Sequence, residues 1–466
     1  MTYALLDWYD DIVAFDFPTF IGKTLSTVDP AAEYLPNWHI DLLAEYLEAA
    51  RRNEISRLII NMPPRSLKSV CVSVAWPAWL LGKDPRSRII AASYASSLSV
   101  KHSIDSRLVV TSEWYKKIFP DVKISRDQNE KYKFITTQRG YRLATSVGGS
   151  VTGEGGNYLI IDDPLNPAQA MNSLRRDAAN RWFDHTFSSR LDDKRLGVIV
   201  LVMQRLHQHD LTGHLLAKGG WEHLCLPAVA TERTVYHLGK VAHVREEGEL
   251  LHSAREDEGL IARAKIEQGS SVFSAQYQQM PVVDDGEMVR PWWIGRYKAP
   301  PAHFSRIVQS WDTAIKTGMK NDSSACLTFG ESDGKSYLLD VFSGKAEYPD
   351  LKRMFFSTAT RFQPHVILIE DKASGQQLLQ DVRRETKLPV VAINPKADKL
   401  TRFAAVSALI EAGRLQLPEQ ASWLADFEAE LYAFPNGNHD DQVDALSQYL
   451  DWVRGETWNH LRIRNI

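Results

Sequence analysis

The segment of residues 58–69 constrains the fold of this chain more than any other part of the sequence. A short apolar run of strand length ends at a pair of prolines, and Lys68 and Ser69 then open an apolar segment that continues to Leu81. Strand, loop, Lys-Ser and helix in this order are typical of a Walker A motif, in which backbone N–H groups hold phosphates, the lysine neutralises them and the hydroxyl group binds Mg²⁺. The expected phosphate loop comprises Pro64, Arg65, Ser66, Leu67, Lys68 and Ser69.

The match to this motif is incomplete, because its two glycines would fall at Met62 and Leu67. A Lys-Ser pair after a strand is also an ordinary helix start, so a second element has to distinguish the two interpretations. The apolar run of residues 158–161 supplies that element, because it ends in Asp162 and Asp163. The first carboxylate suits the Mg²⁺ shell and the second suits the orientation or deprotonation of the attacking water; the alternative is an acidic turn. Together the two elements favour an ATPase.

The composition is that of a folded protein with more than one domain. At 466 residues the chain is too long for one ordinary core, and a content of 44% hydrophobic and 24% charged residues excludes a disordered chain. No apolar run approaches the roughly 18 residues of a membrane span, and the first residues lack the basic region of a secretory signal. Cys71, Cys225 and Cys326 have no CxxC spacing, which indicates a reducing compartment and no zinc framework.

The charge balance argues against a protein that binds polyanions over its whole surface. Lys and Arg number 55 against 58 Asp and Glu, which gives a net charge of -3. Any contact with nucleic acid must therefore come from local patches, and residues 116–142 are one candidate; a solvated face is the alternative. The basic residues of this segment are Lys116, Lys117, Lys123, Arg126, Lys131, Lys133, Arg139 and Arg142.

Strands and helices are expected to alternate in the first half of the chain, which predicts an α/β domain with a parallel sheet and a nucleotide site at the carboxyl ends of its strands. Beyond the segments above, the expected helices are residues 31–53, 97–112 and 168–191, and the expected strands are residues 87–93 and 196–203. Gln204 and Arg205 follow the last strand and are placed to sense a γ-phosphate. His207 and His209 suggest a metal site, but their spacing fits no standard zinc pattern.

The second half of the chain is organised differently, because acids stand at the ends of its predicted elements. A turn-rich stretch at residues 282–300 is the expected linker. After it, two buried strands each end in an acid, a hairpin turn is expected at residues 331–334, and a late helix begins with a group of aspartates, two of which share one helix face. The acids at these places are Asp312, Glu370, Asp440, Asp441 and Asp444.

This order of strands, helices and acids indicates a mixed-sheet nuclease of the RNase H-like class. Such an enzyme needs two divalent ions about 4 Å apart, and only clustered hard oxygen ligands hold them. Asp371 is an alternative ligand, and the sequence leaves open which two of the helical aspartates bind. Basic residues between the acids are candidates for contact with DNA phosphates, or else they are solvated helix faces. These basic residues are Arg383, Arg384, Lys387, Lys396, Lys399 and Arg402.

Several motifs together resemble the large terminase subunit of tailed bacteriophages. The matching residues are 62–65 with Lys68 and Ser69, Thr152 and Gly153, residues 160–164, Arg205, residues 210–213 and residues 273–281. The resemblance implies a P-loop ATPase domain of the ASCE type at residues 1–281, with a helical lead-in at residues 1–30, and an RNase H-like nuclease domain at residues 301–466. It implies a motor that uses ATP and Mg²⁺ to move double-stranded DNA into a procapsid, and a nuclease that cuts concatemeric DNA with two Mg²⁺ or Mn²⁺ ions.

The resemblance also implies partners, a location and residue roles. The partners are double-stranded DNA, the portal protein and the small terminase subunit, and the chain is expected as a free monomer that forms a ring on the portal, in the host cytoplasm and without membrane contact. Carried over by position, Lys68 and Ser69 hold phosphate and Mg²⁺. Asp162 lies in the Mg²⁺ shell and Asp163 is the catalytic carboxylate, while Arg205 lies in the element that couples hydrolysis to movement. Asp312, Glu370, Asp440, Asp441 and Asp444 are the nuclease metal ligands.

Two departures from the family pattern concern the ATPase. Relatives commonly carry Gly at the place of Leu67, and often Arg at the place of Glu154, where the Arg is a candidate trans-acting finger. An acidic residue cannot stabilise negative charge in a transition state, so either Arg65, Arg139 or Arg142 takes that role or hydrolysis is slow. The first alternative function is an RNase H-like nuclease or recombinase with a non-hydrolysing N-terminal DNA-binding domain. A helicase-type ATPase and a non-enzymatic portal adaptor are the others.

Overall fold

The computed structural model describes residues 12–151, 153–239, 241–281, 288–313, 323–371, 374–395, 397–436 and 440–463. The chain forms two compact units: an N-terminal unit, Met1–Ala264 with Ser271–Val282, and a C-terminal unit, Lys265–Ser270 with Val283–Ile466. The expected functional boundaries at residues 281 and 301 stay a prediction, and residues 282–287 of the expected linker lie outside the described residues, as do Thr152 and Lys396. No helix in the described ranges is long and apolar enough to cross a membrane.

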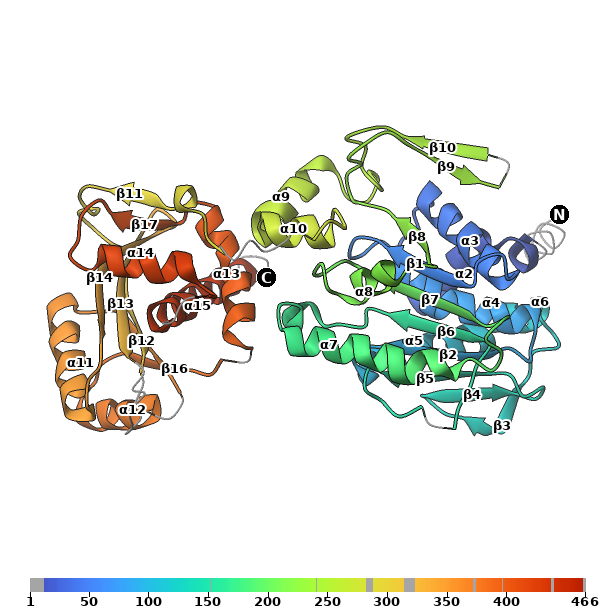
Figure 1. The fold of residues 1–466 in the computed structure, drawn as a ribbon, viewed down its shortest axis with the longest axis horizontal. Coiled ribbons are helices and arrows are strands. Elements are labelled where there is room, and N and C mark those ends of the chain that lie inside the picture. Colours follow the sequence, from blue (N-terminus) through green and yellow to red (C-terminus); the bar gives the residue numbers. More distant parts are fainter. Residues whose placement is uncertain are drawn as a thin grey trace. The chain divides into compact units, whose positions relative to one another are not determined.

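The N-terminal unit is built on an eight-stranded sheet in the order β3-β4-β5-β2-β6-β7-β1-β8 (Figure 1). Neighbours from β5 to β8 are parallel, whereas β3 and β4 form an antiparallel edge. The expected parallel α/β domain is therefore confirmed. The strands are β1 Arg57–Asn61, β2 Arg88–Ser93, β3 Ile124–Asn129, β4 Lys133–Thr136, β5 Tyr141–Ser146, β6 Tyr158–Asp162, β7 Val198–Met203 and β8 Glu222–Cys225. A separate hairpin pairs β9 Thr234–Leu238 with β10 Val241–Arg245.

Helices cover both faces of this sheet. Successive strand residues point to opposite sides, and because the central strands are apolar at successive positions, both faces need a covering layer. Leu58 and Ile60 belong to one apolar core, and Ile59 belongs to the other. The first core contains residues of α2 Phe17–Val28, α3 Trp38–Arg51, η1 Val70–Ala75, α4 Trp76–Lys83, α5 Ser96–Thr111 and α6 Glu113–Ile118. The second contains residues of α7 Ser173–Trp182, η3 Phe183–Phe187 and α8 Leu211–Lys218. The remaining helices are η2 Pro167–Gln169, η4 Ser188–Arg190, α9 Glu258–Gln268 and α10 Ser270–Gln276.

Three expected helices differ from the structure at proline or cap residues. The helix expected at residues 31–53 begins only at Trp38, after the cap residue Asn37. The helix expected at residues 168–191 begins at Ser173 and continues as short π and 3₁₀ turns. The helix after the phosphate loop opens as the π-helix η1, because Pro77 has no N–H for the Ser73 carbonyl.

The C-terminal unit has a seven-stranded mixed sheet in the order β11-β17-β14-β13-β12-β15-β16. Its strands are β11 Gly295–Tyr297, β12 Arg306–Asp312, β13 Ser324–Ser332, β14 Lys335–Gly344, β15 Val366–Glu370, β16 Val390–Ile393 and β17 Leu415–Pro418, after the turn η5 Pro291–Trp293. One core includes residues of α13 Lys399–Glu411, α14 Leu424–Ala433 and α15 Asp441–Ile463, and the other includes residues of α11 Tyr348–Phe362 and α12 Ser374–Glu385. The hairpin expected at residues 331–334 is present, with positive φ at Asp333 and Gly334.

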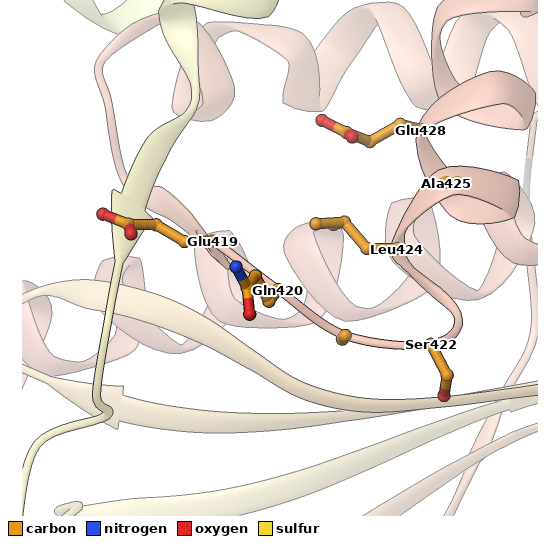
Figure 2. A pocket seen from close by; sticks show the side chains of 7 residues that line it. Glu419, Gln420, Ser422, Leu424, Ala425 and Glu428 are labelled. Atoms are coloured by element: carbon orange, nitrogen blue, oxygen red, sulfur yellow. The ribbon is translucent and has the colours of Figure 1, made fainter.

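A surface pocket of about 520 Å³ lies beside α14 in this unit. Figure 2 shows Glu419 and Gln420 on one side of it and Leu424 and Glu428 on the other. None of its lining residues is a predicted site residue, so the candidate sites lie elsewhere in the fold.

Candidate active sites

The nucleotide-site residues meet at one edge of the N-terminal sheet because of the strand order. β7 lies between β1 and β6 and is parallel to both, with Asn61 opposite Met203 and Asp162 opposite Val202. The segments that follow these strands are the phosphate loop, the Gln204–Arg205 pair and the second aspartate. Their convergence at the carboxyl ends of parallel strands is the arrangement expected of a nucleotide site.

The two aspartates after β6 contact the Lys-Ser pair of the phosphate loop. The Ser69 hydroxyl donates to Asp162 Oδ1 at 3.0 Å, and Lys68 Nζ lies 3.6 Å from Asp163 Oδ2. Lys68 is 6% exposed and Asp162 is 1% exposed. Burial raises the pKa of Asp162, while hydrogen bonds and Lys68 oppose that rise. The four side chains can therefore receive a phosphate and a hard cation between them.

Two further residues support Asp162 and were not predicted from the sequence. The Ser73 hydroxyl donates to Asp162 Oδ2 at 2.7 Å, and His102 Nδ1 lies 3.5 Å from the same oxygen. Burial, and next the charge of Arg142, lowers the pKa of His102 to about 4, so this imidazole is neutral at physiological pH. Ser73 follows Ser69 by four residues and so shares its helix face, which is a usable sequence signal. His102 lies on a separate helix, α5, and had no such signal.

The phosphate loop uses the left-handed backbone region at two residues that are not glycine. The φ angles are 63° at Arg65 and 64° at Leu67, and Leu67 stands where the motif has its second glycine. This region costs a side-chain-bearing residue roughly 1–2 kcal/mol. Leu67 is half-buried against the apolar core, and its carbonyl accepts from Cys71 N–H at 3.0 Å. The chain thus keeps the glycine conformation, and the packing of the leucine side chain opposes the strain.

A comparison of two substitutions at Leu67 isolates this strain. Leu67→Ala and Leu67→Gly both remove the packing of the leucine side chain, but only Gly relieves the left-handed φ angle. We expect Leu67→Gly to be the more stable by about 1 kcal/mol, after the greater chain entropy of glycine is subtracted. Urea unfolding of the N-terminal unit measures the difference. Leu108, on the exposed side of helix α5, is the control: there the Gly variant should be less stable than Ala by about 1 kcal/mol. The same order of stability at both positions would contradict this explanation.

Gln204 and Arg205 lie beside the aspartates but face different partners. The Gln204 N–H donates to Asp163 Oδ1 at 3.3 Å, and its side-chain oxygen is buried without a partner among the described residues. The Arg205 Nε donates to both Asp210 oxygens, at 3.1 and 3.0 Å, and the Arg205 N–H donates to Gln279 Oε1 at 2.9 Å. Arg205 is therefore held in a buried ion pair, and its guanidinium is a positioning group in this conformation.

Asp210 connects this ion pair to helix α8. It caps the helix by accepting from Gly213 N–H at 2.9 Å, and it also accepts from Leu206 N–H at 3.0 Å. We expect Asp210→Ala to lower the free energy of unfolding of the N-terminal unit by about 3–5 kcal/mol, because it leaves the buried Arg205 charge unpaired. Denaturant unfolding measures the loss. Asp193→Ala is the control: this half-exposed aspartate pairs with the exposed Arg195 at 3.6 Å, and its loss should cost less than about 1 kcal/mol. A small loss at Asp210 would show that the pair is not a structural support.

The structure bears on two predictions about charged residues: the roles predicted for Arg142 and the consequence of an acid at position 154. Arg142 is fully buried and donates through Nη2 to the Ser73 carbonyl at 3.0 Å. The prediction that it contributes to a DNA-binding patch or serves as an arginine finger is wrong, because both roles require an accessible guanidinium. Lys133 is half-buried and lies 2.5 Å from Glu154, so the acid at the place where an arginine was expected is neutralised within this chain. Arg65 and Arg139 remain as predicted fingers.

The acids of the C-terminal unit approach one another through two packing relationships. β12 is parallel to β15, with Trp311 opposite Ile369, so Asp312 and Glu370 end neighbouring strands. Helix α15 is fixed to β12, because the Ser310 hydroxyl donates to the Ala445 carbonyl at 2.8 Å. Burial, and then the charges of the neighbouring acids, raises the pKa of Asp312 to about 8. The neighbouring acids whose charges raise the pKa of Asp312 are Asp444, Glu370 and Asp441.

Two cations of helix α13 also contact this group of acids. Lys399 Nζ lies 2.8 Å from Asp440 Oδ1 and 2.5 Å from Asp444 Oδ2, and Arg402 Nη2 lies 3.0 Å from Asp444 Oδ1. Asp371 instead accepts from the Asn394 amide at 3.4 Å. Within the described ranges, no three His, Cys, Asp or Glu side chains are arranged to hold a metal ion as they stand. Asp312 and Glu370 nevertheless end neighbouring parallel strands, and the acids at the start of α15 lie near enough to contribute to the raised pKa of Asp312; carboxylate oxygens are the ligands that hard divalent cations prefer.

Comparisons with known proteins agree with the fold described for the chain and with the RNase H-like character of its C-terminal unit. Residues 309–451 match the family model described as the Terminase RNaseH-like domain. The large terminase of a thermophilic bacteriophage in complex with ATP-gamma-S has 11% identity and a TM-score of 0.52, and a second structure of that terminase, in another crystal form, has 11% identity and a TM-score of 0.53. Each match covers 88% of this chain and 98% of the other.

A third solved structure, the HK97 bacteriophage large terminase, has 12% identity and a TM-score of 0.37, with coverage of 92% of this chain and 99% of that chain. No curated protein matches the sequence. The expected resemblance is confirmed in the fold and in the RNase H-like family model.

Proposed function

Because this chain has the fold of bacteriophage large terminases and its residues 309–451 match the terminase RNaseH-like family, we propose that it is the large subunit of a DNA-packaging terminase. ATP hydrolysis in the N-terminal unit drives double-stranded DNA through the portal into a procapsid. A two-metal endonuclease in the C-terminal unit cuts concatemeric DNA at the start and end of packaging. The observation that carries the proposal is two separate groups of acids, one beside a Lys-Ser phosphate loop and one at the ends of neighbouring strands and of helix α15 in the C-terminal unit.

In the ATPase, the residues around β1 and β6 divide the work of binding and proton transfer. Lys68 neutralises phosphate, and the Ser69 hydroxyl and Asp162 hold Mg²⁺, which supplies charge stabilisation at the phosphates. Asp163 orients the attacking water and accepts its proton. The Gln204 N–H and Lys68 fix that carboxylate, at 3.3 and 3.6 Å, so the base is positioned by backbone and side chain together.

In the nuclease, the carboxylates serve as ligands for two Mg²⁺ or Mn²⁺ ions. Asp312, Glu370, Asp441 and Asp444 hold the ions, with Asp440 as a further ligand at the start of α15. Bound divalent ions supply activation of water and stabilisation of the leaving oxygen. The position of Asp312 at the end of β12, and the hydrogen bond from Ser310 to the Ala445 carbonyl, hold the acids of β12 and α15 in a fixed arrangement.

The proposal extends to assembly and location. The chain acts as a ring on the portal, receives DNA with the small terminase subunit, and works in the host cytoplasm during virion assembly. The exposed basic residues of the 116–142 segment are candidate DNA contacts, because a chain with a small negative net charge can attract a polyanion only through such local patches. They are Lys116, Lys117, Lys123, Arg126, Lys131 and Arg139.

Two assays on one preparation of the full chain test the proposed function. We expect ATP turnover that rises with double-stranded DNA, and Mn²⁺-dependent nicking of supercoiled plasmid that EDTA abolishes. Nicking without ATP turnover would favour the alternative, an RNase H-like nuclease or recombinase with a non-hydrolysing N-terminal domain. ATP turnover without nicking would contradict the nuclease assignment.

A further inference from the structure

Lys399 forms a bridge between two carboxylates at the start of helix α15. Its Nζ lies 2.8 Å from Asp440 and 2.5 Å from Asp444, which are one helical turn apart and present their oxygens on one face. One ammonium group thus contacts two of the acids that the proposed function assigns to metal. Because of its charge and its position, the Lys399 ammonium occupies the place of a metal ion between Asp440 and Asp444.

The location of Lys399 on its own helix indicates that the acids hold it there. It is the first residue of α13, where the helix dipole disfavours a positive charge, and the helix cap is already provided by Asp398, which accepts from Thr401 N–H at 3.0 Å. The lysine therefore gains nothing from its helix. Its favourable interaction is with Asp440 and Asp444.

Arg402, one turn later on α13, contacts the same site in a different way. Its side chain is 11% exposed and contacts Asp444 at 3.0 Å, whereas the Lys399 side chain is 49% exposed. A buried guanidinium is costly to move, while a half-exposed ammonium can leave for solvent by rotating its flexible stem. Of the two cations, Lys399 is the exchangeable one.

We propose that Lys399 is a built-in counter-ion that holds Asp440 and Asp444 together without metal and is displaced when a divalent ion binds. It is a positioning residue that competes with the metal and so sets its affinity. This inference rests on the proposed nuclease function, because it requires that the acids bind metal. Once displaced, the ammonium is free to meet a phosphate of the DNA.

The test is a titration of the full chain with Mn²⁺ in the absence of DNA. The electron paramagnetic resonance signal of free Mn²⁺ measures how much of the ion remains unbound. Lys399→Met keeps the length of the side chain and removes its charge, and Lys335→Met, at the exposed start of β14, is the matched control. We expect Lys399→Met to bind Mn²⁺ about tenfold more tightly than wild type and Lys335→Met to bind it equally. Unchanged or weaker binding by Lys399→Met would overturn the inference.

Thermal unfolding separates competition from a merely structural role. In EDTA, Lys399→Met should melt below wild type, because Asp440 and Asp444 then repel each other. In saturating Mn²⁺ the difference should disappear, whereas an equal loss in both conditions would overturn the inference. Should wild type and Lys399→Met both fail to bind Mn²⁺, the proposed nuclease fails as well; Mn²⁺ binding that is insensitive to Lys399 leaves the nuclease intact and removes only this inference.

Discussion

ATP turnover should fall by at least about a hundredfold in Lys68→Ala, while Mn²⁺-dependent nicking stays at the wild-type level. Lys68 is buried beside Asp163 in the expected phosphate loop, so its removal takes away charge stabilisation that grows in the transition state. Asp163→Asn should cost a similar factor, because the amide cannot accept the proton of the attacking water. Phosphate release in the presence of double-stranded DNA measures both.

A lysine outside the nucleotide site controls for charge and folding. Lys101 lies on helix α5, is largely exposed and pairs with Asp105 one turn away, at 2.6 Å. Lys101→Ala should retain wild-type ATP turnover. Turnover that survives in Lys68→Ala would exclude the phosphate loop as the nucleotide site.

Nicking should fall by at least about a hundredfold in Asp312→Asn or Asp312→Ala, while DNA-stimulated ATP turnover is unchanged. Asp312 is the acid whose pKa is raised to about 8, first by burial and then by the charges of Asp444, Glu370 and Asp441, so it interacts with acids of both β15 and α15. An uncharged side chain there removes one ligand from the expected ions. Relaxation of supercoiled plasmid in Mn²⁺ measures the loss.

The stability of Asp312→Asn distinguishes lost chemistry from lost folding. A raised carboxyl pKa means that the folded state disfavours the ionised form, so the carboxylate lowers stability as pH rises from about 4 toward 8. Without metal at pH 8, Asp312→Asn should therefore unfold at the same or higher denaturant concentration than wild type. A variant that is inactive and clearly less stable would leave the catalytic role without support.

The strands that precede or carry the site residues could be predicted from the sequence because each is a short buried strand bounded by turn residues. Residues 58–61, 158–162 and 366–370 follow this pattern, and the structure places β1, β6 and β15 there. Periodicity shows which residues are buried but does not specify which strands are neighbours. The position of β7 between β1 and β6, which brings Gln204 to Asp163, is visible only in the fold.

The contacts that the sequence could not predict join distant segments. The charge pattern places Arg142 in a basic surface, yet β5 lies inside the sheet and turns this side chain toward Ser73, 69 residues earlier. The same kind of pattern makes Lys399 a phosphate contact, but its partner Asp440 is 41 residues away and reaches it through the packing of α13 on α15. Charge patterns along a chain do not reveal such pairs, because an ion pair needs only proximity in space.

The most direct test of the two-site account is a crossed measurement of ATP turnover and plasmid nicking in Lys68→Ala and Asp312→Ala, each shown to be folded. The account predicts that Lys68→Ala nicks DNA without hydrolysing ATP, and that Asp312→Ala hydrolyses ATP without nicking DNA. A single substitution that eliminates both activities in a folded protein would contradict it.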